Sequence, residues 1–155
     1  QTINDAANTV TSAGTLYIKD LRVGDAPQTQ YAYSVAVFPT KGLSVKLQGR
    51  SYERYWSDYD PVGRTVGTDL GPPWQIPNYS IYDLHVNYRL PTIADKYEIS
   101  MFLHVFNLFD KTYVADSTDN SSFEGVAGAP SHSAQRAEVF LGAPRTVNLG
   151  VKFAF

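Results

Sequence analysis

The clearest indication of secondary structure lies in residues 143–155, Ala-Pro-Arg-Thr-Val-Asn-Leu-Gly-Val-Lys-Phe-Ala-Phe. From Arg145 to Phe155 the odd-numbered positions are apolar after the first, and the even-numbered positions are polar or small. A period of two residues is typical of a β-strand that presents one apolar face and one polar face. We therefore expect a strand over Arg145–Phe155, and the same period recurs earlier in the chain.

Four further stretches alternate in this way, and helical periodicity is hard to find anywhere. The four expected strands are Thr29–Phe38, Leu43–Trp56, Tyr79–Leu90 and Tyr97–Val105. A sixth strand over Leu16–Val23 is a weaker expectation because Lys19, Asp20 and Arg22 interrupt its pattern. Residues 1–15 are polar, and we expect them to form a loop or a disordered segment.

The connections between the expected strands alternate in length. Pro39–Gly42 and Pro91–Lys96 are short, whereas Ser57–Asn78 and Lys111–Ala143 are long and polar. Short turns at one end of antiparallel strands, with long loops at the other, are typical of transmembrane β-barrels. Aromatic residues gather near the strand ends, as a membrane interface favours. A β-sandwich also alternates and also carries Tyr and Trp, so periodicity alone leaves both folds open.

Composition narrows the classes of function. The chain has 155 residues, a formal net charge of −2 and no cysteine. Near-balanced charge gives no reason to expect nucleic acid as a partner. The absence of cysteine excludes a disulfide scaffold, a thiolate zinc site and a cysteine nucleophile within the chain. Residue 1 is Gln and no signal peptide follows it, so we expect a processed protein or a piece of a longer one.

Motifs near the strand ends resemble a known family in their order and spacing. Residues 143–155 resemble the closing strand of TonB-dependent outer-membrane receptors, which starts Ala/Leu-Pro-Arg-Thr and ends in an aromatic residue. His104–Tyr113 contains Asn-Leu-Phe-Asp-Lys-Thr-Tyr and is similar to the family's penultimate-strand signature. Asn78–Leu84 and Gly24–Gln30 are similar to the starts of two earlier strands. The loop phrases resemble the receptors of Bacteroidetes-type bacteria.

The resemblance implies an all-β fold, an antiparallel meander of five or six strands in the C-terminal segment of a large transmembrane barrel. Barrels of this family have about 22 strands and a plug, whereas even small barrels need about eight strands to close. We therefore expect residues 1–155 to be a receptor segment that lacks the plug and the earlier strands and does not function alone.

By the same resemblance, the whole protein is expected to sit in the outer membrane of a Gram-negative bacterium. It would import a scarce nutrient, of the iron-siderophore, cobalamin or glycan type, with energy from the TonB complex acting through the absent N-terminal part. Outer-membrane lipid would surround it. Phe153 and Phe155 would form the C-terminal signal for the barrel-assembly machinery.

No catalytic, cofactor-binding or metal-binding motif is found, and we expect no enzymatic activity. Asp58 with Asp60, or Asp116 with Asp119, could bind Ca²⁺, but no Asp-x-Asp-x-Asp-Gly run is present, so solvated loop carboxylates are favoured.

In the barrel interpretation, the polar strand positions face the interior. They are Lys46, Gln48, Arg50, Asp83, His85, Asn87, Glu98, His104, Asn148 and Lys152. As contacts to a ligand or plug we single out Arg50, Arg54, His85 and His104, although hydration of the wall explains any one of them more simply.

Four aromatic residues in and before the 57–78 loop form a second candidate site, namely Tyr55, Trp56, Tyr59 and Trp74. Such rings could stack on a sugar or a flat chelate, and a membrane girdle or loop packing explains them equally well. The alternative to the receptor is a secreted β-sandwich that binds a ligand such as a carbohydrate. Exposure of the apolar faces distinguishes the two, because a sandwich buries them in a core.

Overall fold

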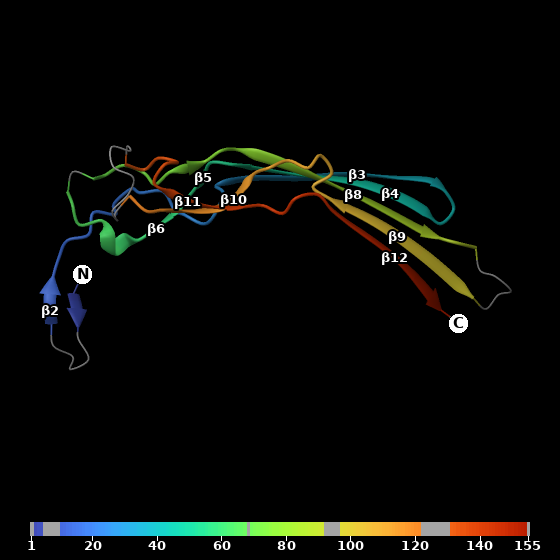
Figure 1. Ribbon diagram of the computed structural model, residues 1–155, viewed down its shortest axis with the longest axis horizontal. Coiled ribbons are helices and arrows are strands. Elements are labelled where there is room, and N and C mark those ends of the chain that lie inside the picture. The colour runs from blue at the N-terminus through green and yellow to red at the C-terminus, as the bar shows by residue number, and fades with distance from the viewer. Residues whose placement is uncertain (1, 5–9, 68, 92–96, 122–130, 155) are drawn as a thin grey trace. The chain divides into compact units, whose positions relative to one another are not determined.

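The computed structural model describes residues 2–4, 10–67, 69–91, 97–121 and 131–154 (Figure 1). The chain divides into two compact units, which we call the sheet unit and the loop unit. The sheet unit comprises Gln28–Glu53, Pro77–Tyr113 and Leu141–Phe155; the loop unit comprises Gln1–Pro27, Arg54–Ile76 and Val114–Phe140. No helix in the described part of the chain is long and apolar enough to cross a membrane.

The sheet unit is one antiparallel sheet of five strands in the order β12-β9-β8-β4-β3, as Figure 1 shows. The strands are β3 (Thr29–Thr40), β4 (Leu43–Glu53), β8 (Tyr79–Arg89), β9 (Glu98–Phe106) and β12 (Thr146–Ala154). Each overlaps one of the five strands predicted from the period of two. Each long strand pairs with the next along the chain, which confirms an all-β fold with an antiparallel meander.

The strand register places Val and Leu residues of all five strands on one face. One row across the sheet runs through Val35, Leu47, Leu84, Val105 and Val147, and the next through Val37, Val45, Val86, Leu103 and Leu149. We call this surface the apolar face. No other described strand of the sheet unit covers it, and Leu149 and Val35 keep 73% and 67% of their surface exposed.

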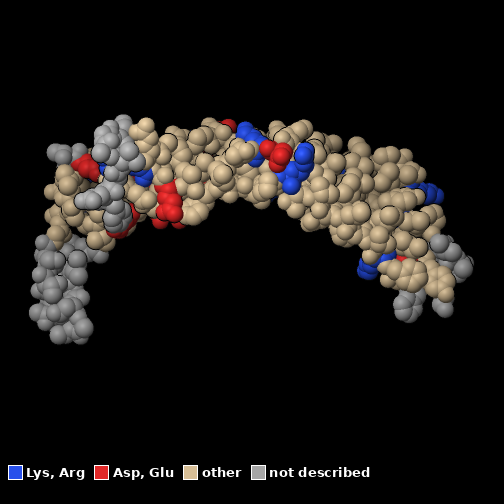
Figure 2. All heavy atoms as spheres, viewed as in Figure 1, with Lys and Arg blue, Asp and Glu red and all other residues tan. Residues whose placement is uncertain are grey.

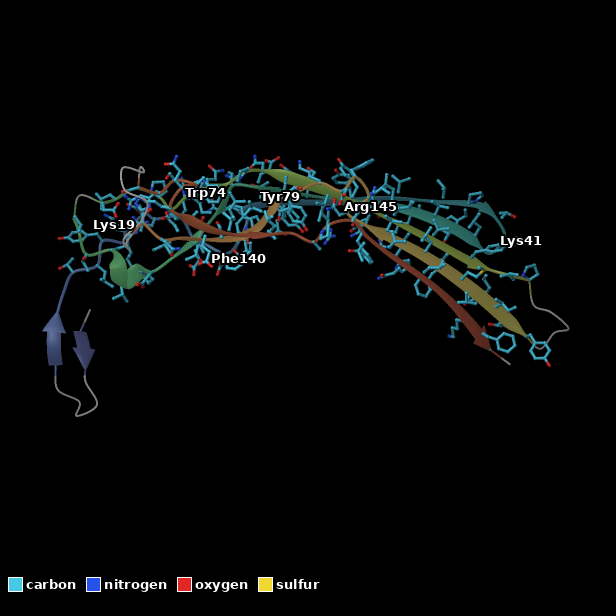
Figure 3. The ribbon with its side chains drawn as sticks, viewed as in Figure 1. Lys19, Lys41, Trp74, Tyr79, Phe140 and Arg145 are labelled. Carbon is cyan, nitrogen blue, oxygen red and sulfur yellow. The ribbon has the colours of Figure 1, made fainter. Side chains whose placement is uncertain are left out.

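The same register places the polar strand residues together on the opposite surface, which we call the polar face. One row contains Lys46, His85, His104 and Asn148, and Gln48 lies opposite Asp83. In the view of Figure 2, charged spheres on this unit lie toward the two ends of the strands. Lys41 and Tyr79, labelled in Figure 3, mark opposite ends of the sheet.

The turn between β3 and β4 is tighter than the sequence suggests. Strand β3 continues through Pro39 and Thr40, so that only Lys41 and Gly42 form the turn. Gly42 has a φ of +82°, and the carbonyl of Arg89 lies where a Cβ would stand, so glycine is required there. The register shifts between Val37 and Thr40, a bulge at which proline is tolerated in an edge strand.

The loop unit contains short strands where the sequence suggests irregular loops. They are β1 (Thr2–Asn4), β2 (Val10–Ala13), β5 (Tyr55–Trp56), β6 (Asp58–Tyr59), β7 (Gln75–Ile76), β10 (Val114–Asp119) and β11 (Ala137–Leu141), the last reaching one residue beyond the unit, with a 3₁₀ turn η1 (Pro61–Gly63). Strand β1 pairs with β2, β5 with β7, and β10 lies between β11 and β6.

Three predictions need correction in these regions. The expected strand Leu16–Val23 is wrong, because those residues form turns and irregular backbone. Strand Leu43–Trp56 is interrupted at Arg54, whose φ of +52° breaks the extended backbone between β4 and β5. Residues 2–4 and 10–13 form a paired hairpin rather than a loop, while residues 1 and 5–9 of the expected N-terminal loop lie outside the described part.

Candidate ligand-binding site

A buried hydrogen-bond network on the polar face centres on Asp83. Its Oδ2 accepts a hydrogen bond from Nη2 of Arg50 at 2.7 Å, and its Oδ1 accepts one from the backbone N–H of Asn107 at 2.9 Å. The side chain of Asp83 is only 4% exposed, against 37% for Arg50. A buried carboxylate needs such partners to offset its lost hydration. Asp83 therefore holds the Arg50 guanidinium in a fixed place.

Asn107 ties together the end of β9 and the segment that leads into β12. Its amide Nδ2 donates to the carbonyls of Lys111 (2.9 Å) and Ala143 (3.0 Å), and its Oδ1 accepts from the N–H of Lys111 (2.9 Å). Its φ of +49° is one that asparagine tolerates better than most residues. Asp110 adds a second tie, because its Oδ1 accepts from the N–H of Arg145 at 2.8 Å.

A column of three tyrosine rings lies beside this network. Tyr79 stacks on Tyr113 with ring centroids 4.6 Å apart, and Tyr52 lies 5.0 Å from Tyr79 on the other side. The ring of Tyr113 lies directly over Gly142, where any side chain would overlap it. The N–H of Gly142 also donates to the carbonyl of Tyr113 at 2.9 Å. Tyr113 is therefore held by packing on two sides.

These groups line an open cavity of about 330 Å³. Its lining consists of Arg50, Ile81, Asp83, Phe106, Asn107, Tyr113, Ala143, Pro144 and Thr146. Most of this wall is apolar, and a few polar groups converge on it, which is the usual make-up of a small-molecule site. The cavity forms the candidate ligand-binding site of the sheet unit.

The two histidines singled out from the sequence are direct cross-strand partners. His85 and His104 pair in the register of β8 and β9, with ring centroids 4.8 Å apart in an edge-to-face arrangement. Phe106 lies within 6.1 Å of both rings. The Nε2 of His104 is buried and has no hydrogen-bond partner among the described residues. The pair thus belongs to an aromatic patch on the polar face.

Arg50 and Arg54 belong to different units of the chain. Arg50 lies on β4 in the sheet unit and lines the cavity, whereas Arg54 belongs to the loop unit and follows the end of β4. The left-handed backbone at Arg54 ends the alternation of β4, so Arg54 does not continue the strand that carries Arg50.

The four loop aromatics do not form a ring cluster, because no ring–ring contact joins them within the described part of the chain. Trp56 packs against the guanidinium of Arg22 at 5.6 Å, and Tyr59 against that of Arg64 at 5.2 Å. Tyr55 is buried in β5. Trp74 is held through its backbone, since its N–H donates to Asp119 and its carbonyl accepts from Ser57. These contacts favour loop packing for the four residues.

Phe153 lies on the apolar face with 56% of its surface exposed. Its ring stacks on Tyr97, with centroids 5.8 Å apart. Phe155 lies outside the described residues.

The loop unit holds a charged network that the sequence did not indicate. Arg64 is only 1% exposed, and its Nη1 lies 3.3 Å from Asp69 and donates to the carbonyl of Gly71 at 3.1 Å. His132 lies between two carboxylates, with Nδ1 2.8 Å from Asp119 and Nε2 2.7 Å from Asp69. His132 follows Asp69 by 63 positions and Arg64 by 68, too far for any local pattern to reveal these contacts.

Two carboxyl groups of the loop unit have shifted pKa values of opposite sign. Burial raises the pKa of Asp119, but hydrogen bonds from Ser121, His132 and the N–H of Trp74 outweigh it and lower the pKa below its usual value. The pKa of Asp25 is raised by partial loss of hydration and by the nearby charges of Asp58 and Asp116, although the residue as a whole is exposed. No three His, Cys, Asp or Glu side chains in the described ranges are placed to hold a metal ion.

The chain was compared with protein-family models, with curated protein sequences and with solved structures, and none of them matches it.

Proposed function

We propose that this chain forms part of the wall of an outer-membrane β-barrel, in an active transporter of the TonB-dependent type. The observation that carries the proposal is the apolar face, on which five adjacent strands expose Val, Leu and aromatic side chains together. Soluble monomers rarely expose contiguous apolar patches of more than a few hundred Å². In a membrane barrel, lipid tails contact such an apolar face, while the polar face lines the barrel interior.

Aromatic residues at both ends of the apolar face support a membrane interface. At one end Tyr33 donates a hydrogen bond to the hydroxyl of Tyr82 (3.1 Å), and Phe109 lies 5.5 Å from the Tyr82 ring. At the other end lie Tyr88 and the stacked pair of Tyr97 and Phe153. From Tyr82 to Tyr88 the strand rises about 20 Å at roughly 3.3 Å per residue. Bacterial barrels have an apolar band of about 25 Å between aromatic girdles.

The open edges of the sheet indicate that further strands complete the wall. Strands β3 and β12 each pair on one side only among the described residues. Unpaired backbone N–H and C=O groups cost several kcal/mol each in lipid, so an open five-stranded sheet is not a stable membrane structure. In the proposal, other strands of the same transporter cover both edges, and the chain does not transport on its own.

The resemblance of the sequence motifs to those of TonB-dependent receptors supports this type of transporter. Hydrogen bonds of Asn107 and Asp110 join the Asn107–Tyr113 signature to the segment that starts at Ala143. The two motifs therefore share the structural role of linking the end of β9 to the start of β12. By the resemblance, the transporter imports a scarce nutrient of the siderophore, cobalamin or glycan type, driven by the TonB complex of a Gram-negative bacterium.

A secreted β-sandwich that binds a ligand remains the second candidate, because alternating strands rich in Tyr also build sandwiches. A sandwich packs two sheets face to face over a shared apolar core. The described part of the sheet unit contains one sheet, and its apolar face is exposed, which favours the barrel wall.

The two candidates differ in the behaviour of the 155-residue chain in water. We expect it to aggregate in buffer, and in detergent to gain β-structure without a cooperative unfolding transition, when followed by gel filtration and circular dichroism. A soluble monomer with one cooperative thermal transition would contradict the barrel proposal and support the sandwich.

Energy coupling needs a separate experiment on the intact gene product. We expect it to fractionate with the outer membrane and to bind the purified periplasmic domain of TonB. If the protein is found in the outer membrane but does not bind TonB, the barrel proposal stands and its dependence on TonB is contradicted.

A further inference from the structure

The cavity at Arg50 has the chemistry of a site for a small organic anion. Nη2 of Arg50 donates to Asp83, and Nε is buried and has no hydrogen-bond partner among the described residues, so the Nη1 and Nη2 end of the fork is the part left for a ligand. A guanidinium carries five N–H donors in a planar fork that matches a carboxylate. Asp83, whose other oxygen is held by Asn107, therefore fixes the orientation of Arg50 and leaves donors for a second acceptor.

The side chains of Asn107 and Asp83 in the lining already have hydrogen-bond partners. The Asn107 side chain makes three hydrogen bonds to backbone groups, and both oxygens of Asp83 accept one each. Arg50 is the only cationic side chain among the lining residues. A ligand that enters thus meets one fixed cationic donor.

The rest of the lining suits a flat apolar body. Ile81, Phe106 and Pro144 supply apolar surface, and the Tyr113 ring is held in place between Tyr79 and Gly142. Because Tyr79 and Gly142 cover the two faces of that ring, a ligand meets only its edge, and an edge-to-face contact is one of the favoured arrangements of aromatic rings. A cavity of about 330 Å³ is at the small end of ligand sites, which fits a single-ring molecule.

We propose that this cavity binds a small aromatic carboxylate, with the carboxylate on Arg50 and the ring against the apolar wall of Ile81, Phe106 and Pro144. The site lies wholly within the sheet unit, so binding itself does not depend on where the protein resides. Only the further step, that such an anion is or resembles the transported ligand, rests on the proposed function.

Benzoate and its neutral isostere benzamide are the probes, tested by calorimetry on the intact gene product purified in detergent. We expect benzoate to bind at least about tenfold more tightly than benzamide, because a charge-assisted bidentate pair is worth more than about 1.4 kcal/mol. Arg50→Gln should abolish this preference. Arg89→Gln, on the same face at the other end of β8, should leave it unchanged.

Arg50→Gln removes the partner of a buried carboxylate and can unfold the protein. Arg50→Lys keeps the charge but loses the planar fork, and we expect it to weaken benzoate binding severalfold with unchanged circular dichroism. Equal affinity for benzoate and benzamide in the unmodified protein, or no binding of benzoate at millimolar concentration, would overturn the proposal. Binding of benzoate that survives in Arg50→Lys and Arg50→Gln alike would also overturn it. None of these results depends on TonB binding.

Discussion

At the scale of single residues, a few polar side chains hold together backbone segments that strand pairing leaves open. Asn107 and Asp110 link the end of β9 to the residues before β12, and Asp83 links β8 to β4 and to Asn107. Asn107 is 5% exposed, so its three side-chain hydrogen bonds are shielded from water.

Asn107→Ala should therefore lower the free energy of unfolding by about 2–4 kcal/mol, since each lost hydrogen bond is worth about 1 kcal/mol and alanine disfavours a positive φ. Denaturant unfolding of the intact protein in detergent measures this. Asn148→Ala, on the exposed polar face of β12, is the matched control and should change the free energy by less than about 0.5 kcal/mol. Equal effects of the two substitutions would show that Asn107 has no special structural role.

Protonation of Asp119 in acid should lower the stability of the loop unit. Its folded pKa is lowered, so its stabilising effect is present above the unfolded value of about 3.9 and is lost as the pH falls through the folded pKa. Asp119→Asn should cost about 3 kcal/mol at pH 7, because His132 and the Trp74 N–H lose a charged acceptor. Hydrogen exchange of residues 69–76 and 114–121 at pH 7 reports this loosening.

Asp25→Asn provides a control with the opposite sign. The pKa of Asp25 is raised, so its ionised form is disfavoured in the folded state at pH 7. Asparagine also tolerates its φ of +59°. We expect this substitution to leave the loop unit as stable as before or slightly more stable, by less than about 1 kcal/mol, since Asp25 is exposed. Loosening by Asp25→Asn as large as that by Asp119→Asn would contradict the assignment of both shifts.

At the scale of elements, the alternation of side chains was enough to predict the long strands. The sequence predicts Thr29–Phe38 and Arg145–Phe155, and the structure has Thr29–Thr40 and Thr146–Ala154. A strand of nine or more residues repeats its period several times and so stands out. Two-residue strands such as β6 and β7 are too short to show a period, and the contact of Arg64 with His132 joins distant segments. Neither feature could be predicted.

The candidate site was partly predictable for the same reason. Arg50 and Asp83 were placed on one face by periodicity, and the register pairs their strands. The cavity also depends on Asn107 and Tyr113, which follow β9 and whose positions are set by hydrogen bonds and by packing on Gly142. No pattern along the sequence encodes those contacts.

The two faces of β12 give a direct prediction at this scale. Leu149 and Asn148 are neighbours whose side chains lie on opposite faces, Leu149 in a central apolar row. Arginine on the lipid side near the membrane midplane costs about 2–4 kcal/mol, whereas the interior tolerates it. Leu149→Arg should therefore reduce the amount of assembled protein in outer-membrane fractions far more than Asn148→Arg. Equal loss in the two variants would mean that the apolar face does not contact lipid.

At the scale of the whole molecule, the sheet unit has two chemically distinct faces, and its outer strands β3 and β12 each pair on one side only among the described residues. Phe155 concerns the whole molecule, because the resemblance to TonB-dependent receptors implies that this residue acts in assembly of the barrel. Deletion of Phe155 from the intact protein should lower its level in the outer membrane, measured by fractionation, without changing ligand affinity in the inserted molecules. Normal insertion of the truncated protein would remove that role.

The most direct test of the lipid-facing sheet uses the absence of cysteine from the chain. Single cysteines at Val147, Asn148, Leu149 and Lys152 of the intact protein, labelled with a fluorophore, are reconstituted in vesicles that contain nitroxide-labelled lipid. If the apolar face contacts lipid, we expect strong quenching at Val147 and Leu149, which lie on that face, and weak quenching at Asn148 and Lys152, which lie on the polar face. Quenching that does not alternate along β12, or is absent at all four positions, would contradict the claim that the apolar face contacts lipid.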